Sequence, residues 1–253
     1  MIYDIQKASM LKRIPAWILD AILAIIVATV AMAGLAFLLN LDGHVAALDE
    51  IYVSYEQKYG INFSLSEEEV AKLGEDVLAT YQAAAEELSK DTRAEQAYEK
   101  VINTLFAVLS LSLFVPSLLL EFLVPLWLKN GQTLGKKAFG VGVMRTDGVR
   151  VNKMILFTRA VLGKYTLETM IPVLLLLMVL LGTLGMIGLL ALIVALFLIA
   201  GTLFVSKNHT AIHDRLACTV AVDLSSQLIF DTPEEREEYI AKADADAGFR
   251  SEQ

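Results

Sequence analysis

The chain has 253 residues, of which 56% are hydrophobic, and a net charge of −8. This composition is too apolar for an ordinary soluble domain. Charge is divided between segments: residues 42–100 hold fourteen acids against five bases, whereas residues 129–164 hold eight bases against one acid. Opposed blocks of this kind predict the two sides of a membrane and argue against a nucleic-acid partner. The single cysteine, Cys218, excludes an intrachain disulfide.

Three apolar blocks, 14–39, 101–128 and 171–205, predict the membrane spans. About 20 residues cross the hydrocarbon core, so each of the first two blocks holds one helix. The first block is also longer than the apolar part of a cleavable signal peptide, which indicates a retained helix. The third block is interrupted at Gly182 and Gly185, and its apolar pattern extends backwards to residue 154. It therefore predicts a third span over residues 158–181 and a fourth over residues 185–206.

We therefore expect an all-α polytopic membrane protein with four transmembrane helices, an extracytoplasmic helical insert and a small cytoplasmic β element. Alternating apolar residues predict a β-hairpin in 129–153, and Cys218–Val222 is a second strand candidate placed to pair with it. A capping-box pattern at Ser66 and Glu69 predicts a helix start in the acidic insert. The segments in chain order are 1–41 (first transmembrane helix with a cytoplasmic N-terminus), 42–100 (acidic helical extracytoplasmic insert), 101–128 (second transmembrane helix), 129–153 (cytoplasmic loop with the hairpin), 154–206 (transmembrane helices three and four) and 207–253 (cytoplasmic strand and polar tail).

Asp20 is the most informative residue, because it lies about six residues inside the first apolar block. A carboxylate at the centre of a span raises the free energy of membrane insertion by roughly 2.5–3.5 kcal/mol. We therefore expect it to have a charged partner or a functional role. Arg13 lies about two turns earlier, near the same helix face. Glu121 lies at a similar depth in the second span, roughly 12 Å from its cytoplasmic end against roughly 9 Å for Asp20. We expect a polar cluster in the cytoplasmic half of the membrane, built from Arg13, Asp20, Glu121, Arg159 and Glu168.

Three segments together carry a resemblance to a known family. They are Arg13 with Asp20, the run Gly131–Lys137 followed by Asp147-Gly148 and Arg159, and the run Ile212–Ala217 leading into Thr219–Val222. In this order they resemble the RDD family of bacterial integral membrane proteins, which is named for one arginine and two aspartates. The resemblance covers about 8–40 and 101–223 and leaves out the acidic insert and the tail.

The resemblance assigns the named arginine to Arg13 and the two aspartates to Asp20 and Asp214. The chain departs from the family pattern at Cys218, where a glycine is expected. This departure affects only the expected local geometry of the strand that follows. The resemblance implies a multi-pass protein of the bacterial plasma membrane and a transport function, with cation/proton antiport proposed for some members. The distribution of bases places both the N- and C-termini in the cytoplasm.

Two functions remain open from the sequence. In a transporter, Asp20 and Glu121 would share a proton or a small cation while Arg159 competes for the vacant site. Because four helices form only a thin wall around a pore, such a transporter would require a homo-oligomer. In a scaffold or accessory protein, the pairs Arg13–Asp20 and Glu121–Arg159 would only fix the helices, and the insert 42–100 would bind a protein partner. The lipid bilayer surrounds the chain in both cases.

Neither enzymatic chemistry nor a cofactor is expected. His213 and Asp214 are adjacent, and adjacent residues on a helix do not face each other as a catalytic dyad would. The other histidines show no metal-ligand spacing with His213, so we expect no metal site. The Gly131–Gly135 run lacks the Gly-Lys-Ser/Thr ending of a phosphate-binding loop, and we interpret it as a turn against the helix ends.

Overall fold

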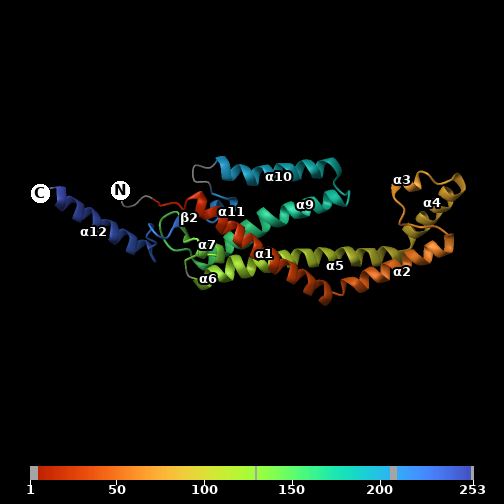
Figure 1. Cartoon of the computed structure of the whole chain (residues 1–253), viewed down its shortest axis with the longest axis horizontal. Helices are drawn as coiled ribbons and strands as arrows, with labels where there is room; N and C mark the ends of the chain where they lie inside the picture. Colours follow the sequence, from red (N-terminus) through yellow and green to blue (C-terminus); the bar gives the residue numbers. More distant parts are fainter. Residues whose placement is uncertain (1–4, 129, 206–209, 252–253) are drawn as a thin grey trace. The chain divides into compact units, whose positions relative to one another are not determined.

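The computed structural model describes residues 5–128, 130–205 and 210–251 (Figure 1). The remaining positions, which include the predicted segment boundaries at 129 and 207, lie outside the described residues. The chain forms two compact units. One comprises Met1–Thr29 with Leu113–Gln253, and the other comprises Val30–Ser112.

Within the described residues, four helices are long and apolar enough to cross a membrane, as predicted. The first is α1 (Met10–Leu38). The second, Thr92–Leu128, consists of α5 (Thr92–Pro116), the π-helix η1 (Ser117–Leu123) and α6 (Val124–Leu128). The third, Lys153–Leu180, consists of α8 (Lys153–Phe157), the π-helix η2 (Thr158–Met170) and α9 (Ile171–Leu180). The fourth lies in α10 (Gly185–Val205), and Gly182 and Gly185 adopt positive φ where the chain turns from α9 into α10.

These helices present apolar side chains outward. The most apolar stretch of α1 is not buried within the chain, and the large side chains of Trp17, Phe37 and Phe197 are exposed. Because a soluble monomer rarely exposes so extended an apolar surface, the helices require lipid around them. The all-α polytopic fold predicted from the sequence is therefore confirmed. The second helix begins at Thr92 rather than at residue 101, because its charged first turns continue the helix beyond the apolar block.

A two-stranded sheet is present in the described part of the chain. Strands β1 (Val141–Arg145) and β2 (Thr219–Asp223) pair antiparallel, with Val143 opposite Ala221. The N-terminal segment runs beside β2, since Ala8 N–H donates to the Ala221 carbonyl. The predicted hairpin within 129–153 is only partly right: its return forms isolated bridges, such as Met144 with Arg150, and the partner strand of β1 is β2.

Three further helices lie next to the strands along the chain, in the same compact unit. Helix α7 (Leu134–Ala138) precedes β1, and α11 (Ile212–Leu216) precedes β2. Helix α12 (Pro233–Ser251) follows the sheet and forms most of the polar tail. Cys218, between α11 and β2, has a φ of +51°, a left-handed conformation that favours glycine.

The acidic insert folds as its own helical unit. It contains α2 (Leu41–Tyr59), α3 (Glu67–Val70) and α4 (Glu75–Lys90). The Glu69 carboxylate accepts hydrogen bonds from the Ser66 backbone and hydroxyl, which places a capping interaction at the predicted helix start. Helices α2 and α4 are joined by an ion pair between Lys58 and Glu87 at 2.5 Å.

Candidate functional site

Asp20 is buried on α1 and receives its hydrogen bonds from the segment before β1. The Thr133 hydroxyl donates to one carboxylate oxygen, and the Gly135 backbone N–H donates to the other at 2.7 Å. The Lys136 ammonium lies 3.8 Å from the carboxylate. These donors belong to the first turn of α7, where unpaired backbone N–H groups favour an anion. Among the described residues, the base beside Asp20 is Lys136, and no direct ion pair joins Asp20 to Arg13, although the scaffold alternative expects one.

Two glycines allow this segment to approach α1 and the sheet. A Cβ on Gly135 would lie 2.2 Å from the Ala16 carbonyl oxygen, a distance that no real side chain adopts. Gly131 has a φ of +63°, which favours glycine. The Gln132 side chain then donates to the Val141 carbonyl at 2.9 Å and holds the turn against β1. The run is thus a turn that packs α7 directly on α1.

Glu121 lies in η1, between Pro116 and Pro125. Proline removes a backbone donor and interrupts the α-helical ladder, and this stretch has the i→i+5 bonding of a π-helix instead. The Glu121 side chain is buried and accepts a hydrogen bond from the Lys164 ammonium of η2. The base in direct contact with Glu121 is therefore Lys164, whereas the scaffold alternative expects Arg159 in that place.

The π-helical form of η2 brings three ionisable side chains to one face. Arg159 and Glu168 are nine residues apart, about two and a half turns of an α-helix, which would place them on opposite sides. With hydrogen bonds from i to i+5, the same separation is close to two turns. Arg159 and Glu168 both contact α11, and Lys164 on the same face reaches η1.

Asp214 of α11 forms a buried ion pair with Arg159. The guanidinium Nε lies 2.8 Å from the carboxylate, and both side chains are 4% exposed. The Thr219 hydroxyl donates to the same carboxylate oxygen at 3.0 Å. Burial alone would raise the pKa of the Asp214 carboxyl, but the Arg159 charge lowers that pKa well below its ordinary value. The carboxylate is therefore ionised at neutral pH.

His213, the neighbouring residue on α11, binds Glu168 through two groups. Its backbone N–H donates to one carboxylate oxygen at 2.9 Å, and its Nδ1 lies 2.8 Å from the other. Its Nε2 lies 3.1 Å from Arg159 Nη2 and 3.6 Å from an Asp214 carboxylate oxygen. Gly163 permits this close packing, because a Cβ there would lie 2.6 Å from His213.

Lys136 couples the Asp20 contact to the other charges. Burial, reinforced by the Arg159 charge, lowers the pKa of Lys136 to about 8, although Glu121 and Asp20 oppose the decrease. These side chains therefore interact electrostatically as one group. We define the buried charge cluster as Asp20, Glu121, Lys136, Arg159, Lys164, Glu168, His213 and Asp214.

The four residues predicted as an ion or proton site, Asp20, Glu121, Arg159 and Glu168, all lie in this cluster. Arg13 lies half-buried on α1 and is outside the cluster as defined. Lys136, Lys164, His213 and Asp214 were not predicted as members. One signal in the sequence pointed to Asp214, because the family resemblance assigns it as the second of the two named aspartates.

Among the residues that the structure describes, no three His, Cys, Asp or Glu side chains converge to hold a metal ion. Each of the four carboxylates contacts a lysine, an arginine or a histidine from another element. The arrangement links the first three spans to α7 and α11.

Comparison with known proteins identifies the family. The model of the RDD family matches residues 7–218, which include every member of the buried charge cluster. No curated protein and no solved structure matches the chain. The match covers most of the chain and contains the arginine and both aspartates identified above. The chain therefore belongs to the RDD family and is a membrane protein.

Proposed function

We propose that this RDD-family protein transports a small monovalent cation in exchange for protons through the buried charge cluster. The observation that carries the proposal is the charge balance of the cluster. Its described members are four carboxylates, three bases and one histidine, so the carboxylates outnumber the lysines and arginine by one. An uncompensated charge within a membrane protein is costly, and a bound cation, or a proton on His213 or on a carboxylate, would supply the fourth positive charge.

The two π-helices support the proposal, because they provide segments whose hydrogen bonding can change. Segments η1 and η2 contact each other, and the Ser117 hydroxyl donates to the Ala160 carbonyl at 3.1 Å. A π-helical stretch differs from an α-helix by one backbone hydrogen-bond register and is frequent at functional sites. A change of register in η2 would rotate Arg159 and Glu168 away from a common face. Such a movement would alter access to the cluster without unfolding the span.

The orientation and assembly are part of the same proposal. The bases of residues 129–164 support a cytoplasmic location for that segment, with both termini on the same side of a bacterial plasma membrane. The acidic insert then lies outside. Four spans enclose little space, so a homo-oligomer would complete the pathway.

A flux assay tests the proposal. The protein is reconstituted into liposomes with an acidic interior that contains a pH-sensitive dye, and sodium or potassium chloride is added outside. Wild type should raise the internal pH, and Glu121→Gln should slow this change at least tenfold. The matched control is Glu86→Gln, because Glu86 forms an exposed ion pair with Lys90 in the insert.

The result separates transport from a structural role. A cation-dependent pH change in wild type and in the control, lost in Glu121→Gln at unchanged thermal stability, supports the carrier. The absence of any cation-dependent change in wild type contradicts it. Equal rates in wild type and Glu121→Gln contradict the role of the cluster.

A second candidate function rests on the insert. Val30–Ser112 is a compact unit with its own helix contacts, including the T-shaped pair of Phe63 with Tyr81 at 5.4 Å. A scaffold would use this acidic unit to bind a protein partner. Deletion of residues 42–100 should abolish partner capture from a scaffold, whereas a carrier without the insert should still move cations.

A further inference from the structure

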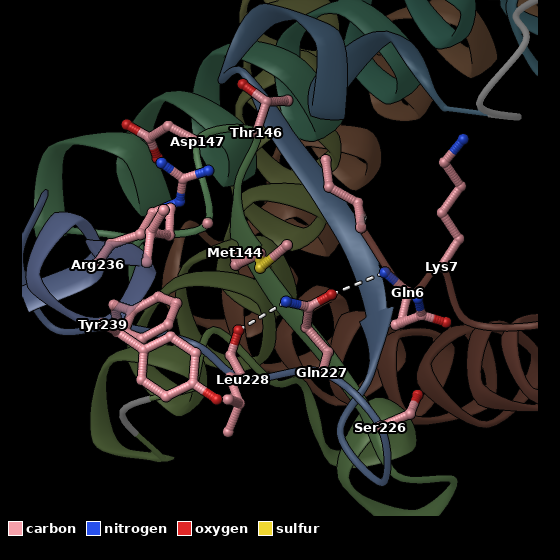
Figure 2. Close-up of a pocket in the computed structure, with 14 residues that line it drawn as sticks. Gln6, Lys7, Met144, Thr146, Asp147, Ser226, Gln227, Leu228, Arg236 and Tyr239 are labelled. Carbon is pink, nitrogen blue, oxygen red and sulfur yellow. Dashed lines mark hydrogen bonds between the residues drawn. The ribbon is translucent and has the colours of Figure 1, made fainter. Parts of the chain in front are cut away.

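A cavity of about 530 Å³ lies beside the end of β1, formed by residues outside the buried charge cluster (Figure 2). Its walls come from the N-terminal segment, the turn after β1, the loop before α12 and the first turns of α12. Its volume is within the range of about 300–1,000 Å³ typical of small-molecule sites. We refer to it as the sheet-end cavity.

Hydrogen bonds between distant segments hold these walls in place. The Gln227 side chain accepts from the Gln6 backbone N–H at 2.7 Å and donates to the Leu228 carbonyl at 2.7 Å (Figure 2). The Phe230 backbone N–H donates to the Gly148 carbonyl at 3.2 Å. The cavity is therefore formed before any ligand arrives, as small-molecule sites usually are.

The charges around the sheet-end cavity favour an anion. Lys7 and Arg236 line it, and the one acid in its lining, Asp147, is ion-paired with Arg145 at 2.5 Å. Among the described residues, no acid pairs with Arg236, whose Nε lies close to Gly148. A guanidinium presents several donors in a plane that matches phosphate oxygens.

Two aromatic rings give the same cavity a flat apolar surface. Phe230 and Tyr239 line the cavity with their ring centroids 5.3 Å apart, and Tyr239 is partly exposed. Ile240 adds apolar surface, while Gln227 supplies a side-chain amide. Aromatic faces stack favourably on planar rings such as nucleobases.

We propose that the sheet-end cavity binds a small organic anion in which a planar ring carries a phosphate, the chemistry of a nucleoside monophosphate. The Arg236 guanidinium holds the phosphate, and the rings of Tyr239 and Phe230 stack against the planar group. The ligand occupies the junction of the sheet with α12, outside the membrane spans. The proposal stands independently of transport.

Calorimetric titration of the full-length protein in detergent tests it with three probes. Adenosine monophosphate carries both the ring and the phosphate, adenosine carries only the ring, and inorganic phosphate carries only the anion. Adenosine monophosphate should bind at least tenfold more tightly than either part. Arg236→Gln should weaken its binding at least tenfold, and the control Lys242→Gln should not, because Lys242 lies further along α12 in an exposed pair with Glu238.

Tyr239→Leu provides a second variant that does not depend on Arg236. It should weaken adenosine monophosphate binding at least threefold, with the unliganded thermal stability unchanged. Absence of a binding signal for adenosine monophosphate in wild type overturns the proposal. It is also overturned if Arg236→Gln and Lys242→Gln bind alike, or if phosphate alone binds as tightly as the nucleotide.

Discussion

Replacement of Gly135 by alanine should destabilise the protein, although alanine is the better helix former. An exposed helical glycine replaced by alanine gains up to about 1 kcal/mol. At this position the new Cβ would lie 2.2 Å from the Ala16 carbonyl oxygen, whereas ordinary contacts begin near 3.4 Å. Helix α7 must therefore retreat from α1 by about 1 Å, a displacement that overpacking studies associate with a cost of about 1–3 kcal/mol.

The retreat also breaks the contact with Asp20. The Gly135 N–H lies 2.7 Å from the carboxylate, and a movement of this size stretches the bond beyond hydrogen-bond distance. Loss of a hydrogen bond to a charged group costs about 1.5–3 kcal/mol. Together, and after the gain in helix propensity, we expect a net loss of about 3 kcal/mol. For a chain of this size that loss lowers the Tm by roughly 6–12 °C.

The assay is thermal unfolding in detergent, followed by tryptophan fluorescence. The matched control is Gly34→Ala, because a Cβ on Gly34 of α1 would contact nothing within 4 Å. The control should leave the Tm unchanged or raise it slightly. A Tm for Gly135→Ala equal to that of Gly34→Ala would refute the direct packing of α7 on α1.

Two further predictions concern ion pairs. Arg159→Leu should cost about 3–5 kcal/mol by leaving Asp214 buried without its base, and Asp214→Leu added to it should restore part of the Tm; strictly additive losses would contradict the pairing. The hydrogen bond from Lys12 lowers the pKa of Asp223 to about 2, so its contribution is complete above the ordinary carboxyl pKa of 3.8 and disappears as the pH falls through 2. The Tm difference between wild type and Asp223→Asn should therefore be present at pH 7 and vanish near pH 2, and a pH-independent difference would count against this pair.

The special backbone at Cys218 shows how a sequence pattern can indicate geometry. The family resemblance placed a glycine at this position, and the residue indeed adopts a left-handed φ of +51°. The strand that follows it, β2, was predicted as a partner for the segment around Val141–Met144 and pairs with it in the structure. The return of the predicted hairpin was less successful, because strand propensity does not specify which neighbour a strand will pair with.

The spans, the existence of the two strands and the burial of Asp20 and Glu121 were determined by the sequence itself, because apolar length, period and an isolated charge are properties of nearby residues. The ion-pair partners were decided only by the tertiary structure. Asp20 meets Thr133, 113 positions away, and Arg159 meets Asp214, 55 positions away. The π-helical register of η2 could not be predicted from the sequence either, because α-helical periodicity puts Arg159 and Glu168 on opposite faces. Contacts between distant segments and a locally altered helical register depend on packing, which no local pattern records.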